Sequence, residues 1–350
     1  MFIYIFMYLI ASFSAISISG RQTIRSSTIV WTVTGIFLTI IIGWRHHVGG
    51  DWNNYLRRFN AISDFSFSQT MEQSDVGYQF LVYWMNAWGF EIYAVNFLSA
   101  ILFVTGLIVF LRRELNPWLG LTVAIPYLII VVSMGYTRQG VAVGLVMWAL
   151  ASLNRRKFLQ FLFFILLAVS FHKSAILMIA FGIFSHGKGK LLKFLAVLVA
   201  GIGIWLSFVE TDSSALWKNY VEAEMQSQGA LIRVVLNAIP AILLLLYRKQ
   251  WKRYFNDYTL WFMVAWASLA SLIAVNFAST AVDRMALYFI PIQIVVYARL
   301  PFLAKNTLSP KVTSTLIVVF YAFILLVWLN FAVNARYWVP YHHMFFLDLF

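Results

Sequence analysis

The sequence predicts an all-α polytopic membrane protein with about twelve transmembrane helices (11 to 13), and three observations support this fold class. Mean hydropathy is +0.80. Only 11% of the 350 residues are charged, whereas a soluble domain has roughly 25%. Apolar stretches near the ~20 residues that cross a bilayer recur from end to end and leave no room for a separate soluble domain. We therefore expect residues 1–350 to form a single integral membrane domain.

Each expected span is an apolar run that ends at charged or turn residues. No basic residue precedes the first run, and Arg21 and Arg25 follow it, which is typical of an anchor and not of a cleaved signal peptide. The run 158–186 is short for two spans, but both of its flanks are basic. We expect a short hairpin there, whose turn at 171–174 lies recessed in a protein-lined or wet cavity. The expected spans are 2–19, 28–44, 91–111, 118–134, 138–153, 158–171, 174–186, 191–208, 230–247, 258–277, 284–299 and 312–331.

The charge distribution predicts the orientation. Most of the 26 Lys and Arg residues fall in the loops on one side, which the positive-inside rule makes cytoplasmic. Of the 13 acidic residues, only Glu114 and Asp257 share that side. We therefore expect both termini and the chemistry to face outward from a bacterial cytoplasmic membrane. We attribute the net charge of +13 to the basic loops that orient the protein in the membrane, and we expect no nucleic-acid partner.

Two outer loops are large, residues 45–90 and residues 209–229. The first loop contains an amphipathic stretch suited to lying on the membrane surface. Aromatic residues in the outer segments offer flat faces for stacking on sugars, although anchoring at the membrane interface explains them equally well. The amphipathic stretch comprises Tyr78, Phe80, Leu81, Trp84, Met85 and Trp88, and the outer aromatics are Trp217, Tyr220, Trp338 and Tyr341.

Polar residues that are costly near a bilayer gather in four groups on this outer side. Arg residues at helix starts suit an anionic headgroup, because the guanidinium group matches phosphate oxygens in a bidentate way. Helix N-termini add partial positive charge and free N–H groups. The groups are Arg45, Asp51, Tyr55 and Arg58; Tyr136, Arg138 and Gln139; His172, Lys173 and Ser174; and Asp283, Arg284 and Tyr288.

Simpler roles exist for these residues. Asp51 could cap the helix that follows it, and His172 could be a hydrogen-bonded turn residue. Arg138 and Arg284 could be snorkelling anchors, as Arg233 and Arg336 are expected to be, and Arg284 could pair with Asp283. The doublets at 46–47 and 342–343 could bind a metal together, but no spaced carboxylates accompany them, so neither a metal site nor a cofactor is expected.

Five strings, taken in order, resemble the EpsG-like branch of the Wzy polysaccharide polymerases. The resemblance runs across most of the chain. Each string is weak alone, whereas the ordered set is fairly specific. The strings are Arg45 with Val48-Gly49-Gly50-Asp51 and Tyr55; Gly77-Tyr78; Thr137-Arg138-Gln139; Phe171-His172-Lys173-Ser174-Ala175; and Asp283-Arg284 with Tyr288.

The resemblance implies a metal-independent membrane glycosyltransferase of the GT-C type. Such enzymes transfer a growing glycan from its undecaprenyl pyrophosphate to a new lipid-linked repeat unit at the outer face. We expect Arg138 and Arg284, with Arg45, to hold the pyrophosphate. His172 is the first candidate for the general base and Asp51 the second. Sugar or phosphate is oriented by Tyr55, Gln139 and Tyr288, while Arg58, Tyr136, Lys173 and Asp283 complete the expected substrate site.

Two other classes fit the composition. An O-antigen ligase or acyltransferase would share an outward-facing site. A transporter of lipid-linked glycan would show broken helices, charges at mid-depth and a repeat of halves, and no repeat is visible. The expected partners are undecaprenyl-pyrophosphate-linked repeat units, membrane lipid and a chain-length regulator protein. The sugars, the linkage and the final polymer (O-antigen, capsule or exopolysaccharide) are left open.

Overall fold

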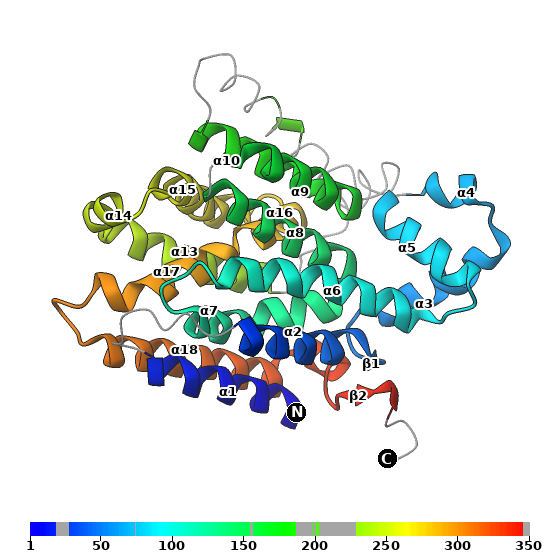
Figure 1. The fold of residues 1–350 in the computed structure, drawn as a ribbon, viewed down its shortest axis with the longest axis horizontal. Helices are drawn as coiled ribbons and strands as arrows, with labels where there is room; N and C mark the ends of the chain where they lie inside the picture. Colours follow the sequence, from blue (N-terminus) through cyan, green and yellow to red (C-terminus); the bar gives the residue numbers. More distant parts are fainter. Residues whose placement is uncertain are drawn as a thin grey trace.

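A computed structural model describes residues 1–18, 28–73, 75–154, 157–186, 198, 201–202 and 229–345. In these residues the chain is a bundle of helices with one pair of two-residue strands (Figure 1). The predicted span 191–208 and the predicted loop 209–229 fall almost entirely outside the described residues, as do Trp217 and Tyr220.

Eleven of the twelve expected spans correspond to helices, in most cases within a few residues of the expected ends. Two of the described helices, α6 and α18, are long and apolar enough to cross a membrane, and the number rises to four if each of two bent pairs is one span. Six further apolar helices have 10–17 residues. The all-α class is thus confirmed and fits a membrane protein. The bundle helices are α1 (Phe2–Ile18), α2 (Thr28–Gly43), α6 (Ile92–Leu111), α7 (Pro117–Ala124), α8 (Thr137–Asn154), α9 (Phe158–Phe171), α10 (Leu177–His186), α13 (Ala230–Leu246), α15 (Tyr258–Ala274), α17 (Pro291–Leu303) and α18 (Pro310–Phe331).

The first large loop folds into short helices that lie to one side of the bundle (Figure 1). One of them, α5, buries Tyr78, Val82 and Met85, whereas Phe80, Trp84 and Trp88 are exposed in a row. Both faces are therefore apolar. One face packs on the protein, and the aromatic row on the other face is available to a membrane surface. The loop comprises β1 (Arg45–His46), α3 (Trp52–Ala61), η1 (Ile62–Asp64), α4 (Phe67–Met71) and α5 (Val76–Ala87).

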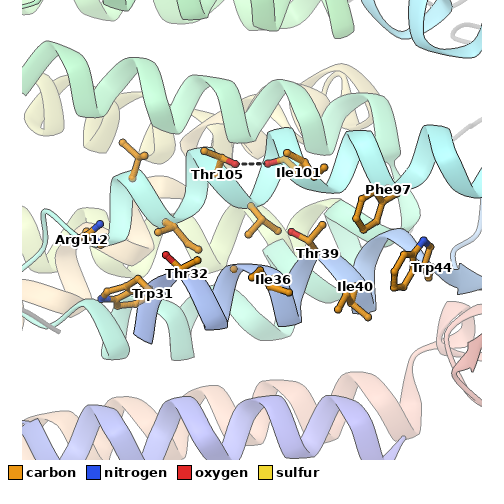
Figure 2. A pocket seen from close by; sticks show the side chains of 14 residues that line it. Trp31, Thr32, Ile36, Thr39, Ile40, Trp44, Phe97, Ile101, Thr105 and Arg112 are labelled. Atoms are coloured by element: carbon orange, nitrogen blue, oxygen red, sulfur yellow. Dashed lines mark hydrogen bonds between the residues drawn. The ribbon is translucent and has the colours of Figure 1, made fainter. Parts of the chain in front are cut away.

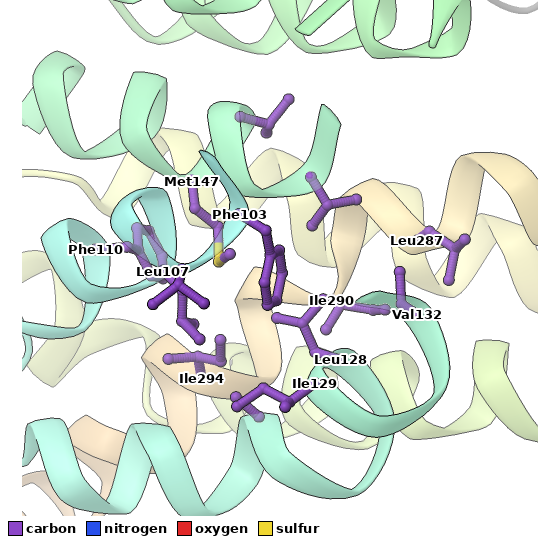
Figure 3. Packing of buried hydrophobic residues seen from close by; sticks show 14 of the residues in the cluster. Phe103, Leu107, Phe110, Leu128, Ile129, Val132, Met147, Leu287, Ile290 and Ile294 are labelled. Atoms are coloured by element: carbon purple, nitrogen blue, oxygen red, sulfur yellow. The ribbon is translucent and has the colours of Figure 1, made fainter. Parts of the chain in front are cut away.

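Close helix packing explains the tight core. A Cβ on Gly106 of α6 would overlap the backbone of Gly144 in α8, so the two helices touch where neither carries a side chain. Below this contact, Phe103 and Leu107 of α6 meet Met147 of α8 and Ile294 of α17 (Figure 3). These elements therefore form a rigid frame for the residues at their ends.

Two segments of the bundle depart from the α-helix. After α7 the chain continues as a π-helix, η2 (Ile125–Ser133), in which the carbonyl of Ile130 accepts a hydrogen bond from the indole of Trp338. Between α16 (Ser279–Ala286) and α17 the axis bends by 42° at η4 (Leu287–Phe289), just before Pro291, which has no N–H to donate. Asn237 of α13 donates to the carbonyl of Ala286, at the end of α16, at 2.8 Å. Such irregular helices are common at functional sites.

The predicted hairpin at 158–186 is confirmed. The chain leaves α9 at His172, passes through η3 (Lys173–Ile176) and returns as α10, and Gly182 of α10 packs against the ring of Phe161 in α9.

At the far end of the bundle lies α14 (Arg248–Tyr254). After α18 come η5 (Val333–Tyr337) and β2 (His342–His343), which pairs antiparallel with β1.

Candidate functional site

The site is built around Arg138, in the first turn of α8. Its guanidinium group forms an ion pair with Asp75, and its backbone N–H lies 3.5 Å from the hydroxyl oxygen of Tyr55. The guanidinium carbon is 5.9 Å from the centre of the Tyr55 ring, a cation–π distance. A quarter of the Arg138 side chain is exposed, whereas Asp75 is buried beneath it. The ion pair with buried Asp75 thus holds the Arg138 guanidinium group in place, while part of the Arg138 side chain stays accessible to a ligand.

Two aspartates stand at helix starts without capping them. Asp51 precedes α3 and Asp75 precedes α5, and neither side chain accepts a capping hydrogen bond. Aspartate at this position normally accepts from the helix. Asp51 instead accepts a long hydrogen bond of 3.4 Å from the side-chain amide of Asn54, and Asp75 is directed to Arg138. The carboxylates are therefore not used as helix caps, and the capping role considered for Asp51 is not performed by its side chain.

His172 lies at the turn of the α9–α10 hairpin and is 9% exposed. Its Nδ1 is 3.1 Å from the hydroxyl oxygen of Tyr288, which is fully buried in η4. Burial, together with the smaller effect of the positive charges of Arg284, Arg138 and Lys173, lowers the pKa of His172 from 6.5 to about 3. The imidazole is therefore neutral at physiological pH.

Arg284 reaches the same place from α16. The side-chain amide of Gln139, next to Arg138 in α8, donates to the backbone carbonyl of Arg284 at 2.9 Å. Its neighbour Asp283 accepts two hydrogen bonds from Arg233 of α13. The hydrogen bond from Gln139 and the Arg233–Asp283 ion pair both hold α16 in place, and they thereby hold the backbone of Arg284.

The electrostatic couplings join these groups into one cluster. Asp51 feels the charges of Arg138, Arg58 and Arg284, although burial is the larger effect and raises its pKa. Asp75 feels Arg138, Lys173 and Arg58, and burial again raises its pKa. Members of the four polar groups identified in the sequence are thus brought together in space, with cations in excess of the carboxylates. Such a cluster is suited to an anion that carries more than one charge.

Arg45 has a different place from the one expected. It is 2% exposed and its guanidinium donates to the carbonyls of Ile42, Val48 and Met134 and to the side chains of Asn96 and Thr137, at 2.6–3.3 Å. These contacts hold the loop after α2 against the start of α8. Arg45 therefore supports the site from inside the protein instead of presenting its charge to a ligand.

Gly49 completes this junction. Its φ is +107°, a conformation that favours glycine, and a Cβ there would overlap the carbonyl oxygen of Met134. Its N–H donates to the carbonyl of Tyr337 at 2.8 Å, and the indole of Trp338 donates to the carbonyl of Ile130 at 2.7 Å. The segment after α18 is thereby locked onto the loop.

The remaining predicted residues lie at the edge of the cluster. Tyr136 is half-buried beside the start of α8, within electrostatic reach of Asp51 and Asp283, and Arg58 is exposed on α3. Of the two histidine doublets, His46 pairs with His342 across β1 and β2, His343 pairs with Arg45, and His47 follows β1. Within the described part of the chain, no group of three or more His, Cys, Asp or Glu residues is arranged to hold a metal.

A separate groove runs between α2 and α6 (Figure 2). Its volume is about 530 Å³, and its lining is almost entirely apolar between Trp44 at one end and Arg112 at the other. None of the predicted site residues is among the side chains that line it. The groove is therefore distinct from the charged cluster.

Sequence reasoning missed two participants. Asp75 was not singled out, although it stands two residues before the Gly77-Tyr78 string. Arg233 was expected to be an interfacial anchor, whereas it forms the ion pair with Asp283. A carboxylate next to a recognised string was the available signal for Asp75. No local signal pointed to the partner of Arg233.

Comparison with known proteins gives one match. The model of the EpsG family matches residues 28–343, nearly the whole chain. No curated protein and no solved structure matches.

Proposed function

Because the chain belongs to the EpsG family, whose members are polymerase-like, we propose that it is a membrane glycosyltransferase that polymerises lipid-linked oligosaccharide repeat units. The donor is the growing glycan on undecaprenyl pyrophosphate, and the acceptor is the non-reducing end of a new lipid-linked unit. The product is a longer glycan and a free lipid pyrophosphate. O-antigen ligase-like transfer, acyl transfer and transport of lipid-linked glycan are the alternatives.

The convergence of Arg138, Arg284 and Lys173 on His172 is the observation that carries this proposal. These residues come from α8, α16 and η3, which are far apart in the sequence. Bringing several cations together costs free energy unless an anion offsets their repulsion. A diphosphate supplies that negative charge and is common to every lipid-linked donor of this type.

Arg138 and Arg284 hold the two phosphates, with Lys173 beside them. As the bond between the anomeric carbon and the bridging oxygen breaks, the electron pair leaves with the pyrophosphate, so negative charge grows on oxygens that face the guanidinium groups. Each charge-assisted contact contributes roughly 1.5–3 kcal/mol. Guanidinium groups thereby take the part that a divalent cation plays in nucleotide-sugar enzymes.

Neutral residues orient the sugars. Tyr55, Gln139 and Tyr288 lie against Arg138, Arg284 and His172 respectively, so each can hold its neighbour and a sugar hydroxyl at once. His172 is neutral and hydrogen-bonded to Tyr288, which makes it a weak base and a good hydrogen-bonding group. We therefore place His172 at the substrate as a binding group and look to a carboxylate for the proton. Tyr136 and Arg58 form the rim.

We further propose that the cluster faces the exterior of the cytoplasmic membrane, with twelve spans and both termini outside. The sequence contains no Cys, so single cysteines can be introduced without background. Asn53→Cys on exposed α3 should react with a membrane-impermeant maleimide in intact cells. Lys252→Cys on α14 should react only after the membrane is opened, and the reverse pattern would invert the topology.

Reconstitution tests the activity directly. Purified protein in liposomes that contain undecaprenyl-pyrophosphate-linked repeat units should yield a ladder of lipid-linked products. Single transfer to a different lipid would mean a ligase, an acylated product would mean an acyltransferase, and movement of the glycan without new bonds would mean a transporter. A chain-length regulator, if added, should narrow the ladder and not create it.

A further inference from the structure

Asp75 is the buried acidic residue at the cluster to which no role has been assigned. It is 5% exposed, and one of its carboxylate oxygens, Oδ2, is paired with Arg138. The other oxygen, Oδ1, is buried with no hydrogen-bond partner among the described residues. An unsatisfied buried carboxylate oxygen is costly and calls for an explanation, since nearly all such atoms are paired.

Two neighbouring polar atoms share this condition. The hydroxyl oxygen of Tyr78 and that of Ser174 are buried, and neither has a hydrogen-bond partner in the described part of the chain. Tyr78 follows Asp75 by three residues on α5, and Ser174 follows Lys173, whose charge reaches Asp75. Two donors and one acceptor thus remain unused beside Arg138, a set that matches sugar hydroxyls.

The backbone also directs Asp75 to this place. Its φ of +65° and ψ of 60° are left-handed, which an Asp tolerates better than most residues but which still costs free energy. The backbone N–H groups of Tyr78 and Gln79 donate to its carbonyl at 2.9 and 3.0 Å and hold this conformation. The carboxylate forgoes the helix cap and turns to Arg138.

We propose that Asp75 is a catalytic residue: it holds Arg138 until the diphosphate of the donor takes the guanidinium, and its freed carboxylate then accepts the proton of the acceptor hydroxyl. This inference rests on the proposed polymerase function. In the step, the acceptor oxygen forms a bond to the anomeric carbon and the bond from that carbon to the pyrophosphate oxygen breaks. The electron pair leaves with the pyrophosphate, and the hydroxyl proton passes to Asp75.

The charges around Asp75 support this sequence of events. Burial raises its pKa, while Arg138, Lys173 and Arg58 act in the opposite direction. When a diphosphate neutralises these cations, their lowering effect is removed and the carboxylate becomes a stronger base. Arrival of the donor thereby switches on the proton acceptor, so the site does not deprotonate a hydroxyl before the donor is in place.

The test separates a catalytic role from a structural one. In liposomes with lipid-linked units, Asp75→Asn should lower kcat by at least ~100-fold, the usual effect of removing a general base. Inorganic pyrophosphate should inhibit this variant more strongly, by roughly 3-fold or more, because a carboxylate no longer competes for Arg138. If the only role of Asp75 were to hold Arg138 in position, its loss would leave Arg138 misplaced and inhibition by pyrophosphate would weaken. That result would overturn the proposal.

Two further variants complete the design. Asp75→Glu keeps the charge but moves the carboxylate by one methylene, so kcat should fall while pyrophosphate inhibition stays near the wild-type value; this variant gives an answer even if the Asn variant misfolds. Glu72→Gln removes an exposed carboxylate three residues away and should leave both quantities unchanged. Wild-type turnover in either Asp75 variant would refute the inference, whereas failure of the wild-type protein to elongate would refute the proposed function.

Discussion

The hydroxyl of Tyr288 lies 3.1 Å from Nδ1 of His172 and joins the broken segment before α17 to the turn between α9 and α10. Both residues are buried, and both belong to short irregular stretches whose backbone is not fixed by a long helix. The hydrogen bond therefore links the segment that carries Arg284 to the turn that carries Lys173. The first predictions concern this pair.

His172→Ala should leave single lipid-linked repeat units accumulating in cells, because the binding group at the centre of the cations is lost. Tyr288→Phe should reduce polymer by a smaller factor, roughly 10-fold, the equivalent of one hydrogen bond of ~1.4 kcal/mol. Gel analysis of lipid-linked glycan measures both effects. Wild-type chain lengths in His172→Ala would remove His172 from the site.

The stability of the protein should fall in mild acid because of His172. Folding lowers its pKa from 6.5 to about 3, so below pH 6.5 the unfolded chain binds a proton that the folded chain does not. The free energy of unfolding is therefore retained above pH 6.5 and lost as the pH drops toward 3, by at most ~1.4 kcal/mol per pH unit. Thermal unfolding in detergent at pH 7 and pH 5 measures this loss, which should be smaller in His172→Gln. An equal loss in that variant would assign the effect to other groups.

Arg138→Lys tests bidentate recognition of phosphate. Lysine keeps the charge but cannot present two parallel N–H groups, so one charge-assisted hydrogen bond of roughly 1.5–3 kcal/mol is lost. Polymer formation should drop about 10- to 100-fold with normal membrane insertion. The matched control is Arg57→Lys, in which an exposed arginine of α3 is changed, and which should remain active. Full activity of Arg138→Lys would count against bidentate binding of the diphosphate by Arg138.

Chelation should not abolish polymerisation. If guanidinium groups supply the charge stabilisation, liposomes treated with EDTA should elongate lipid-linked units at the untreated rate. Titration with Mg²⁺ or Mn²⁺ after treatment provides the check. Loss of activity that one of these ions restores would show that a divalent cation takes part.

A second buried charge cluster, at the other end of α6, should govern stability without governing catalysis. Arg299 donates to Glu114 at 2.7 and 3.1 Å and to Asp257 at 2.8 Å, and all three side chains are buried. Arg299→Met leaves two carboxylates buried without their cation, which typically costs about 3–5 kcal/mol. Thermal unfolding should shift downward, while activity per folded molecule is kept. The twenty residues of α6 place this cluster roughly 30 Å from the site end of that helix, so a change in the pH or salt response of turnover would be unexpected.

Much of the fold was predictable because each helix is indicated by a hydrophobic run and by the charged residues at the ends of that run. The hairpin at His172 followed from two basic flanks, and the turn between its helices falls at the expected residues. Partners across the fold were not predictable in this way. Nothing near Arg233 in the sequence indicates Asp283, fifty positions later. Arg45 shows the same limit, because a charge at the end of an apolar run does not reveal whether its donors meet carbonyls or a ligand.

The pairing of Arg45 with His343 across β1 and β2 has a consequence for biosynthesis. The loop after α2 emerges from the ribosome early, whereas the strand β2, the Tyr337 carbonyl and the Trp338 indole that fasten it are made much later. A partly translated chain can insert its helices but cannot hold Gly49 against Met134. We therefore expect the charged site to be complete only after this segment has been made, and we expect tags or truncations near residue 337 to disturb the site even though they lie far in sequence from its charged groups.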